Sequence, residues 1–292
     1  MSLMRIRVVA GAALGAVLVA APGATATVPA QLSGAAVYAS AANQLSRYAS
    51  GQWATLARTG TLPQFAASPD GRKAAWVTSD GRLQVRQEGK TLTLVSGIQG
   101  GTPCLTPVWS PNSERVAYGG GGDTVMSVRA DGTGAPHKLG TTEGICHLAW
   151  SANGRYLAGY TGEADGLYRL DTTTGKAARA KGVDLVTHVQ SLSPDGRKAV
   201  VEFPRNPDAL GDGGWPTSFK PVVVDMVTGR RHTPQVKGRL LGASYLPDGR
   251  LVVRVAGQEH NTLVVLDEAG EEVQRIAEPS KARKQALLQV LL

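Results

Sequence analysis

Two histidines are the residues of this chain best suited to acid/base chemistry or metal binding. His147 and His188 each lie a few residues before a recurring turn, in segments whose pattern predicts β-strands. No carboxylate accompanies them at a spacing that would complete a catalytic pair or a metal site. Equivalent positions in another repeat hold Thr106 and Leu105. The pattern therefore favours histidines of the core or of a central channel, and it predicts no metal.

The two cysteines, Cys104 and Cys146, fall on predicted innermost strands of neighbouring repeats. Cys104 lies six residues before Ser110, whereas Cys146 lies five before Ser151, so strict alternation would point them to opposite faces. A bulge caused by Pro103 and Pro107 would correct the register. We expect a disulfide between Cys104 and Cys146, and two buried free thiols are the alternative.

Other motifs with a chemical meaning are incomplete. Asn206, Asp208 and Asp212 resemble part of a calcium loop, but Leu210 and Thr217 stand where ligands belong. The glycine run at 119–122 has no following Lys-Ser or Lys-Thr, so it is not a phosphate-binding loop. A Gly-x-Ser-x-Gly motif and a Cys/His dyad with evident spacing are also missing from the sequence. We predict no catalytic residue and no cofactor.

The elements that must position these residues are defined by an internal repeat. A turn of the type Ser-Pro-Asp-Gly-Arg occurs five times at intervals of about forty residues, beginning at Ser68, Ser110, Ser151, Ser193 and Leu246. Pro, Asp or Asn, and Gly favour a tight reversal between two strands. A second turn, Asp-x-x-x-Gly or a close variant, follows about twenty residues later in most copies. Two turns per repeat imply four short strands, which is the pattern of a propeller blade.

Five complete copies and one partial copy predict six blades. The partial copy contains three strand-like segments, 35–40, 44–49 and 52–58. The apolar tail Gln285–Leu292 arrives one period after Pro247 and can supply its missing innermost strand; a short amphipathic helix is the alternative. We therefore expect an all-β, six-bladed β-propeller of four-stranded antiparallel blades over residues 27–292, closed by the C-terminal strand.

Residues 1–26 are expected to be a cleaved signal peptide. Arg5 and Arg7 precede an apolar run from Val8 to Ala21, and Ala24-Thr25-Ala26 forms a small-residue cleavage site. The apolar run is too short for a typical membrane-spanning helix, so we expect no stable membrane span after cleavage. The protein is then secreted or extracytoplasmic.

Charge adds a weak indication about partners. Without Arg5 and Arg7 the chain has 29 basic and 23 acidic residues. It lacks a clustered basic stripe with interleaved aromatic residues, so nucleic acid is not expected as a partner. We expect this protein to be a monomer that binds another protein or an anionic component of the cell envelope.

The recurring aromatic-Ser-Pro-Asp-Gly-Arg pattern resembles the propeller repeats of the TolB family. Residues 109–115, 150–155 and 192–197 carry the resemblance best, and it extends over roughly 35–290. It implies a propeller that acts as an envelope binding protein. TolB proteins also have an N-terminal α/β domain, whereas here the expected signal runs almost directly into the first blade. Binding contacts of the family are therefore not transferred to this chain.

Chain direction predicts the binding face. The fourth repeat has an insertion of about eleven residues within Pro204–Phe219, rich in Pro and Gly. This loop should lie on the same face as the loops that enter the innermost strands. The expected binding residues are Trp215, Asp208 and Asp212 of the insertion, Gln99, Glu143 and Asp184 of the entering loops, and His147 and His188 of the channel. Trp215 is expected to be an exposed anchor.

The arginines of the recurring turn are a second candidate binding feature. Arg72, Arg115, Arg155, Arg197 and Arg250 should occupy one position in five blades and ring the other face. Neighbouring carboxylates cancel much of their charge, so a structural role is favoured. The resulting hypothesis is an exported, non-catalytic propeller that binds a protein or envelope component. The alternative is a propeller hydrolase or lyase that uses His147 and His188.

Overall fold

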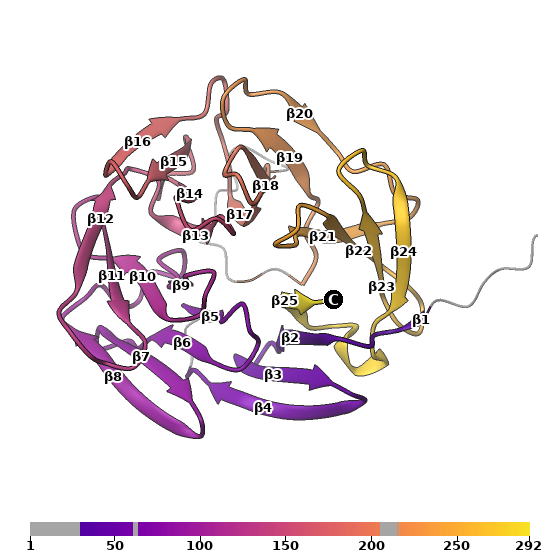
Figure 1. The fold of residues 1–292 in the computed structure, drawn as a ribbon, viewed down its shortest axis with the longest axis horizontal. Coiled ribbons are helices and arrows are strands. Elements are labelled where there is room, and N and C mark those ends of the chain that lie inside the picture. Colours follow the sequence, from indigo (N-terminus) through magenta and orange to yellow (C-terminus); the bar gives the residue numbers. More distant parts are fainter. Residues whose placement is uncertain (1–29, 61–63, 205–214, 216) are drawn as a thin grey trace, which may run out of the picture.

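Six β-sheets arranged around a central axis confirm the all-β propeller (Figure 1). The computed structural model describes residues 30–60, 64–204, 215 and 217–292. The expected signal peptide therefore lies outside the described residues. Within the described residues, no helix is long and apolar enough to cross a membrane.

The strands follow the repeat, and each blade is named by its place in the chain. Blade I contains β5 (Phe65–Ala67), β6 (Ala74–Val77), β7 (Arg82–Gln87) and β8 (Lys90–Ser96). Blade II contains β9 (Val108–Trp109), β10 (Arg115–Gly119), β11 (Thr124–Arg129) and β12 (His137–Thr141). Blade III contains β13 (Cys146–Trp150), β14 (Tyr156–Tyr160), β15 (Leu167–Asp171) and β16 (Lys176–Arg179).

The remaining three blades complete the ring. Blade IV contains β17 (His188–Leu192), β18 (Lys198–Glu202), β19 (Val222–Asp225) and β20 (Arg231–His232). Blade V contains β21 (Leu240–Tyr245), β22 (Leu251–Val255), β23 (Thr262–Leu266) and β24 (Glu272–Ala277), with β1 (Ala30–Gln31) at its outer edge. Blade VI contains β25 (Ala286–Leu291), β2 (Ala35–Ala39), β3 (Gln44–Ala49) and β4 (Gln52–Arg58).

The C-terminal tail closes the ring as a strand. β25 pairs antiparallel with β2, with Ala35 opposite Leu291 and Ala39 opposite Ala286. The helical alternative for this tail is wrong, and only a single 3₁₀ turn at Ser280–Ala282 precedes the strand. A strand is favoured here because both of its faces can be buried against neighbouring blades, whereas an isolated short helix would gain little packing.

A second closure was not expected from the sequence. β1 pairs in parallel with β24 through Ala30 and Gln31, so the described N-terminal segment lies on the outer edge of blade V. Leu32 then enters the core between blades V and VI, where it packs with Ile276 and Val252. The two ends of the described chain thus join these blades at their inner and outer edges.

The recurring turn is held by side-chain hydrogen bonds with the same pattern in four blades. In blade I the Ser68 hydroxyl donates to Asp70 and accepts the Lys73 amide at 2.9 Å, while Asp70 accepts the Arg72 amide at 3.0 Å. Matching bonds are made by Ser110 and Asn112, by Ser151 and Asn153, and by Ser193 and Asp195. These local bonds explain why the turn recurs, because they satisfy backbone donors without help from other blades.

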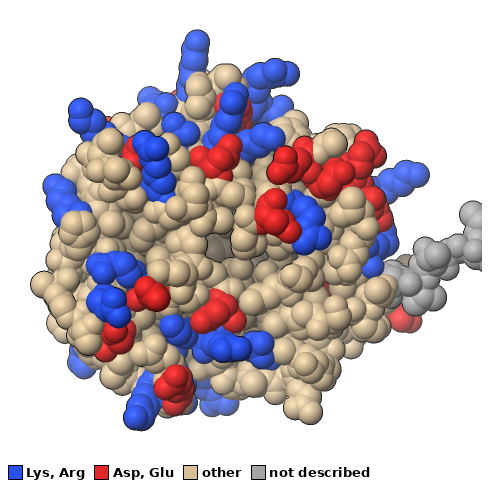
Figure 2. Space-filling model, viewed as in Figure 1, with Lys and Arg blue, Asp and Glu red and all other residues tan. Residues whose placement is uncertain are grey.

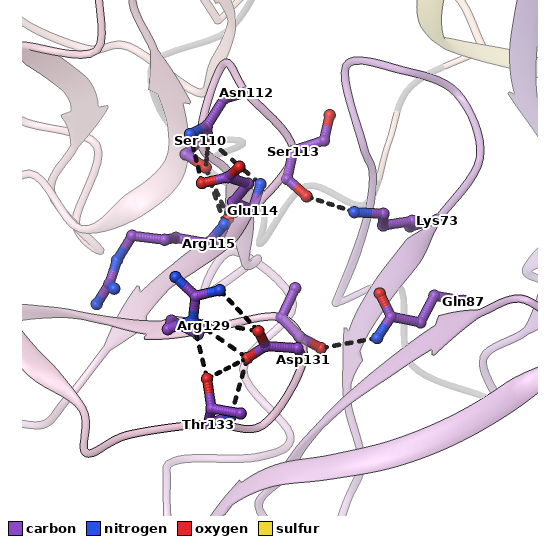
Figure 3. A network of polar contacts seen from close by, with 11 residues as sticks. Lys73, Gln87, Ser110, Asn112, Ser113, Glu114, Arg115, Arg129, Asp131 and Thr133 are labelled. Atoms are coloured by element: carbon purple, nitrogen blue, oxygen red, sulfur yellow. Dashed lines mark hydrogen bonds and ion pairs between the residues drawn. The ribbon is translucent and has the colours of Figure 1, made fainter.

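Polar contacts from the turns also join neighbouring blades, as Figure 3 shows between blades I and II. The Lys73 ammonium of blade I donates to the Ser113 carbonyl at 2.7 Å, and the Gln87 amide donates to the Ala130 carbonyl at 3.2 Å.

Ser113 has a φ of 59°, at the turn position where Gly71 has 66°. Glycine is preferred at this position because it adopts positive φ without strain.

Alignment of the turns corrects the expected arginine ring. The backbone amide of Glu114 donates to Asn112, just as the backbone amide of Arg72 donates to Asp70, so Glu114 occupies the position of Arg72 in its turn. Arg115 lies one position later in the turn. Arg155 and Arg197 pair with Asp171 and Asp225 of the second turn, at 2.7 and 2.9 Å. Each pair joins two residues of the same blade, blade III for Arg155 and blade IV for Arg197, and this supports the structural role favoured for the arginines.

The disulfide between Cys104 and Cys146 is confirmed, with a Cα–Cα distance of 4.7 Å. Its geometry differs from the expectation, because Cys104 lies before β9 rather than on it. The register change occurs in β13, where a bulge separates the pairs of Cys146 and Ala149 and His147 adopts a φ of 44°. The Cys104 carbonyl accepts the His147 amide at 2.7 Å, which fixes the bulge beside the disulfide.

Candidate binding site in the central channel

The ends of the innermost strands enclose a cavity of about 260 Å³ on the axis of the disc. Its wall includes residues from blades I to V and from β25 of blade VI. Figure 2 shows a hollow at the centre of the disc, surrounded mainly by uncharged residues, while Lys, Arg, Asp and Glu lie farther out. The cavity is therefore a feature of the closed ring and of no single blade.

Prolines and aromatic residues form much of the cavity wall. The turn residues Pro69, Pro111 and Pro247 line it, so it extends to the face that carries the recurring turns. Trp109 and Trp150 line the wall between the turns and the strands. Their indole N–H groups donate to the Ala66 carbonyl at 3.3 Å and the Gly154 carbonyl at 2.9 Å, respectively. With these donors used, the two indoles can offer a ligand only their apolar surfaces.

The polar side of the cavity joins blades IV and V. Gln190 accepts the Ala243 amide at 3.0 Å, and the Ser191 hydroxyl accepts the Tyr245 amide at 2.9 Å. Tyr245 also lines the cavity, and burial, followed by the negative charge of Asp195, raises its pKa to about 12. Its phenol is therefore neutral near pH 7 and can act as a hydrogen-bond donor.

Trp215 lies at the other end of the cavity. Its indole N–H donates to the Phe65 carbonyl at 2.9 Å, although the two residues are 150 positions apart in sequence. The side chain is partly buried and packs against the core cluster of blades I and VI. This position corrects the expectation of an exposed anchor: Trp215 points inward and forms part of the cavity wall.

The two histidines lie next to Trp215 and next to each other, and their burial agrees with the core position that the sequence pattern favours as one of two alternatives. The ring centroids of His147 and His188 are 4.1 Å apart, and that of His188 is 5.2 Å from Trp215. Both histidines are buried, and neither lines the cavity. Burial, followed by the neighbouring His147, holds the pKa of His188 well below its ordinary value. His188 is therefore a neutral imidazole near pH 7.

Among the residues that the structure describes, no three His, Cys, Asp or Glu side chains come together as a metal site. Asp208 and Asp212, together with Asn206, lie outside the described residues. Their proposed roles in binding therefore remain predictions.

The three loop residues of the predicted binding face are engaged in local contacts. Gln99 donates to Thr102 at 2.9 Å, Glu143 accepts the Tyr168 hydroxyl at 2.7 Å, and Asp184 pairs with Arg179 at 2.5 Å. Their loops do enter the innermost strands, as predicted, but none of the three residues lines the cavity. Gln99, Glu143 and Asp184 thus belong to the face opposite the turns.

Sequence reasoning missed the residues that build the turn-side mouth of the cavity. The sequence pattern indicates Pro69, Pro111 and Pro247 only as turn formers, and it singles out neither Gln190 nor Tyr245, although all five residues line the cavity. Their signal was present in the repeat, since a residue that follows an innermost strand in every blade must encircle the axis.

Comparisons with known proteins support the fold. No protein family model matches the sequence, and no curated protein matches it. The crystal structure of TolB from Acinetobacter baumannii is similar over 91% of this chain and 69% of that chain, with 18% identity and a TM-score of 0.55. A chain of the Nidogen/Laminin complex is similar over 87% of this chain and 97% of that chain, with 10% identity and a TM-score of 0.53. The chain thus has the fold of a TolB-type six-bladed β-propeller.

Proposed function

We propose that this protein is an exported binding module that receives an apolar side chain of a partner protein in the central cavity. The observation that carries the proposal is the cavity wall, which combines Pro69, Pro111 and Pro247 with the apolar surfaces of Trp109 and Trp150. Aromatic and apolar pockets that exclude water are the usual receptors for the anchor residues of protein interfaces.

The size of the cavity favours a protein partner over a free small molecule. Its volume of about 260 Å³ lies below the roughly 300–1,000 Å³ typical of small-molecule sites. A single large side chain fits this space better than a complete metabolite. The partner backbone would then lie across the face that carries the recurring turns. Tyr245 and Gln190 line the cavity there and offer polar groups to the partner.

Two further observations support export and protein binding. A disulfide such as Cys104–Cys146 persists mainly in oxidising compartments outside the cytosol, which agrees with the signal-like pattern of residues 1–26. A propeller of similar fold takes part in the Nidogen/Laminin complex, so this architecture is compatible with a protein partner.

The proposal is tested by blocking the mouth of the cavity. Ala152 lines the cavity beside its mouth, so the larger side chain of Ala152→Trp should fill the mouth. The substitution removes no hydrogen-bonding side chain. Ala54 is exposed on the outer strand β4, so Ala54→Trp adds the same bulk far from the axis. Wild-type and variant proteins would be used to capture partners from an envelope extract, with the bound proteins quantified by mass spectrometry.

A stoichiometric partner should be retained by the wild type and by Ala54→Trp and lost with Ala152→Trp. Equal retention by all three proteins would place binding away from the cavity. The enzymatic alternative is examined with the same samples, by assaying turnover of small glycosides, lactones and peptides. Turnover that disappears in His188→Gln would favour a hydrolase or lyase over the binding module.

A further inference from the structure

Two segments of the chain are strongly basic. Residues 176–182 and 229–239 together contain seven Lys and Arg residues and no Asp or Glu, whereas the whole chain has 31 basic and 23 acidic residues. The first segment includes the outer strand β16 of blade III, and the second includes the outer strand β20 of blade IV. Both outer strands lie at the rim of the disc, and the second segment continues from the rim toward the innermost strand β21.

The fold joins the two segments into one surface, which we call the basic strip, and this corrects the expectation that the chain has no clustered basic surface. The Arg231 guanidinium donates to the Gly182 carbonyl at 2.6 Å, and its Cζ lies 4.3 Å from the centroid of Phe203. Gly229 lies so close to the Lys181 backbone that a Cβ atom on Gly229 would be 1.9 Å from the Lys181 carbonyl oxygen. Figure 2 shows Lys and Arg gathered along the upper edge of the disc, where Figure 1 places β16 and β20.

The basic strip continues into a hollow beside blade V. This hollow has a volume of about 640 Å³, and Lys220, Lys237 and Arg239 line it together with Ser218, Thr233 and Gln235. The Arg239 guanidinium donates to the Ser218 hydroxyl at 3.3 Å. No Asp or Glu is among the described residues that line the hollow.

Most charges of the strip are not neutralised by neighbours within the described part of the chain. Arg179 pairs with Asp184, but Lys181, Arg230 and Lys237 have no carboxylate partner there. By contrast, Arg155 and Arg197 of the same two blades are paired with Asp171 and Asp225. An unpaired cluster of one sign attracts and concentrates ligands of the opposite charge.

We propose that the basic strip binds a flexible chain of phosphate groups, with one part of the chain in the hollow and the rest along β16 and β20. Lys and Arg donate charge-assisted hydrogen bonds to phosphate oxygens, and the Ser218 and Thr233 hydroxyls can add neutral ones. A flexible chain can enter the hollow and also follow the rim, so it can contact the cations of the hollow and of the two outer strands at the same time. This site is separate from the cavity of the proposed function.

Charge reversal with a matched control tests the proposal. The strip variant is Lys181→Glu/Arg230→Glu/Lys237→Glu, and the control is Arg58→Glu/Lys90→Glu/Lys138→Glu on β4, β8 and β12. All six side chains are exposed, and both variants change the net charge equally. Binding of linear polyphosphate is measured by calorimetry at two salt concentrations, after thermal unfolding has confirmed that both variants are folded.

The strip variant should bind polyphosphate at least tenfold more weakly than the wild type, and the control should remain within about twofold. Affinity of the wild type should fall as salt increases, because phosphate chains release counterions on binding. Equal losses in both variants, or no loss, would overturn the proposal. The proposal would also be overturned if inorganic phosphate bound the wild type as tightly, per phosphate group, as polyphosphate does. It would likewise be overturned if the strip variant lost binding to phosphatidylglycerol vesicles but kept its affinity for polyphosphate.

Discussion

Arg254 and Glu278 form a buried ion pair at the closure of the ring, with 2.9 Å between Nε and Oε2 and side-chain exposures of 2% and 0%. Arg254 lies on β22, and its other nitrogens donate to the Gln285 carbonyl at 2.8 Å and the Ala282 carbonyl at 3.0 Å. The pair thus connects blade V with the segment that leads into β25. One arginine thus donates to one oxygen of a buried carboxylate and to two backbone carbonyls of the closing segment.

Breaking this pair on one side should destabilise the protein strongly. Glu278→Leu leaves a buried, unpaired guanidinium, for which a cost of about 3–5 kcal/mol is expected. The double variant Arg254→Met/Glu278→Leu removes the charge and should recover part of the loss, although two carbonyls lose their donor. Chemical denaturation would measure both. The exposed pair Arg275–Glu272 provides the control, because Glu272→Gln should change stability by less than about 1 kcal/mol. A double variant as unstable as Glu278→Leu would contradict this account.

Removal of the closing strand should lower the melting temperature sharply. Deleting Gln285–Leu292 uncovers the hydrogen-bonding edge of β2 and removes the buried Ala286 and Val290 side chains. An exposed strand edge promotes association between molecules, so the truncated protein should aggregate. Calorimetry and light scattering would test this, with deletion of the exposed Leu292 alone as the control. A truncated protein that stays monomeric and melts like the full chain would show that ring closure does not depend on β25.

The disulfide should contribute measurably to stability. Cys104 and Cys146 are separated by 42 residues, and the chain-entropy model predicts a stabilisation of about 4 kcal/mol for a loop of this size. Cys104→Ser/Cys146→Ser should therefore unfold at lower denaturant than the oxidised wild type and match the reduced wild type. Thiol titration of the denatured, unreduced protein should detect no free thiol. Detection of two thiols per chain would instead show that the bridge does not form in solution.

His188 should make stability depend on pH below neutrality. Its pKa is lowered in the folded protein, so the unfolded chain binds a proton that the folded chain does not as pH falls below about 6.5. Stability should therefore decrease by up to about 1.4 kcal/mol per pH unit from this group between pH 6.5 and 5. The carboxylates with lowered pKa, such as Asp225, lose their contribution only at more acidic pH.

Denaturation of wild type and His188→Phe at pH 6.5 and pH 5 would measure this dependence. The variant should lose less stability than the wild type across this interval, because its buried ring has no proton to gain. His137→Phe, on the exposed outer strand β12, serves as the control and should retain the wild-type dependence. An identical pH dependence in wild type and His188→Phe would contradict the prediction.

Much of the fold could be predicted from the sequence because its signals are local. The Ser-x-Asx turn is stabilised by bonds between residues two to five positions apart, so its recurrence reveals where the strands reverse. The repeat period then predicts the number of blades, and the position of the tail one period after Pro247 predicts the closing strand. The disulfide also followed, since the two cysteines occupy neighbouring repeats in a chain with a signal-like N-terminus.

Only the tertiary structure decided how the candidate site is built. Trp215 points into the channel because the Phe65 carbonyl accepts its indole N–H across 150 residues, and no local pattern specifies that bond. The partners of Arg155 and Arg197 depend on the pairing of different strands, and the bulge at His147 depends on the Cys104 carbonyl. The cavity arises where the ends of the innermost strands meet on one axis. Its size and its face are properties of packing among distant segments, and these contacts leave no periodic signal in the sequence.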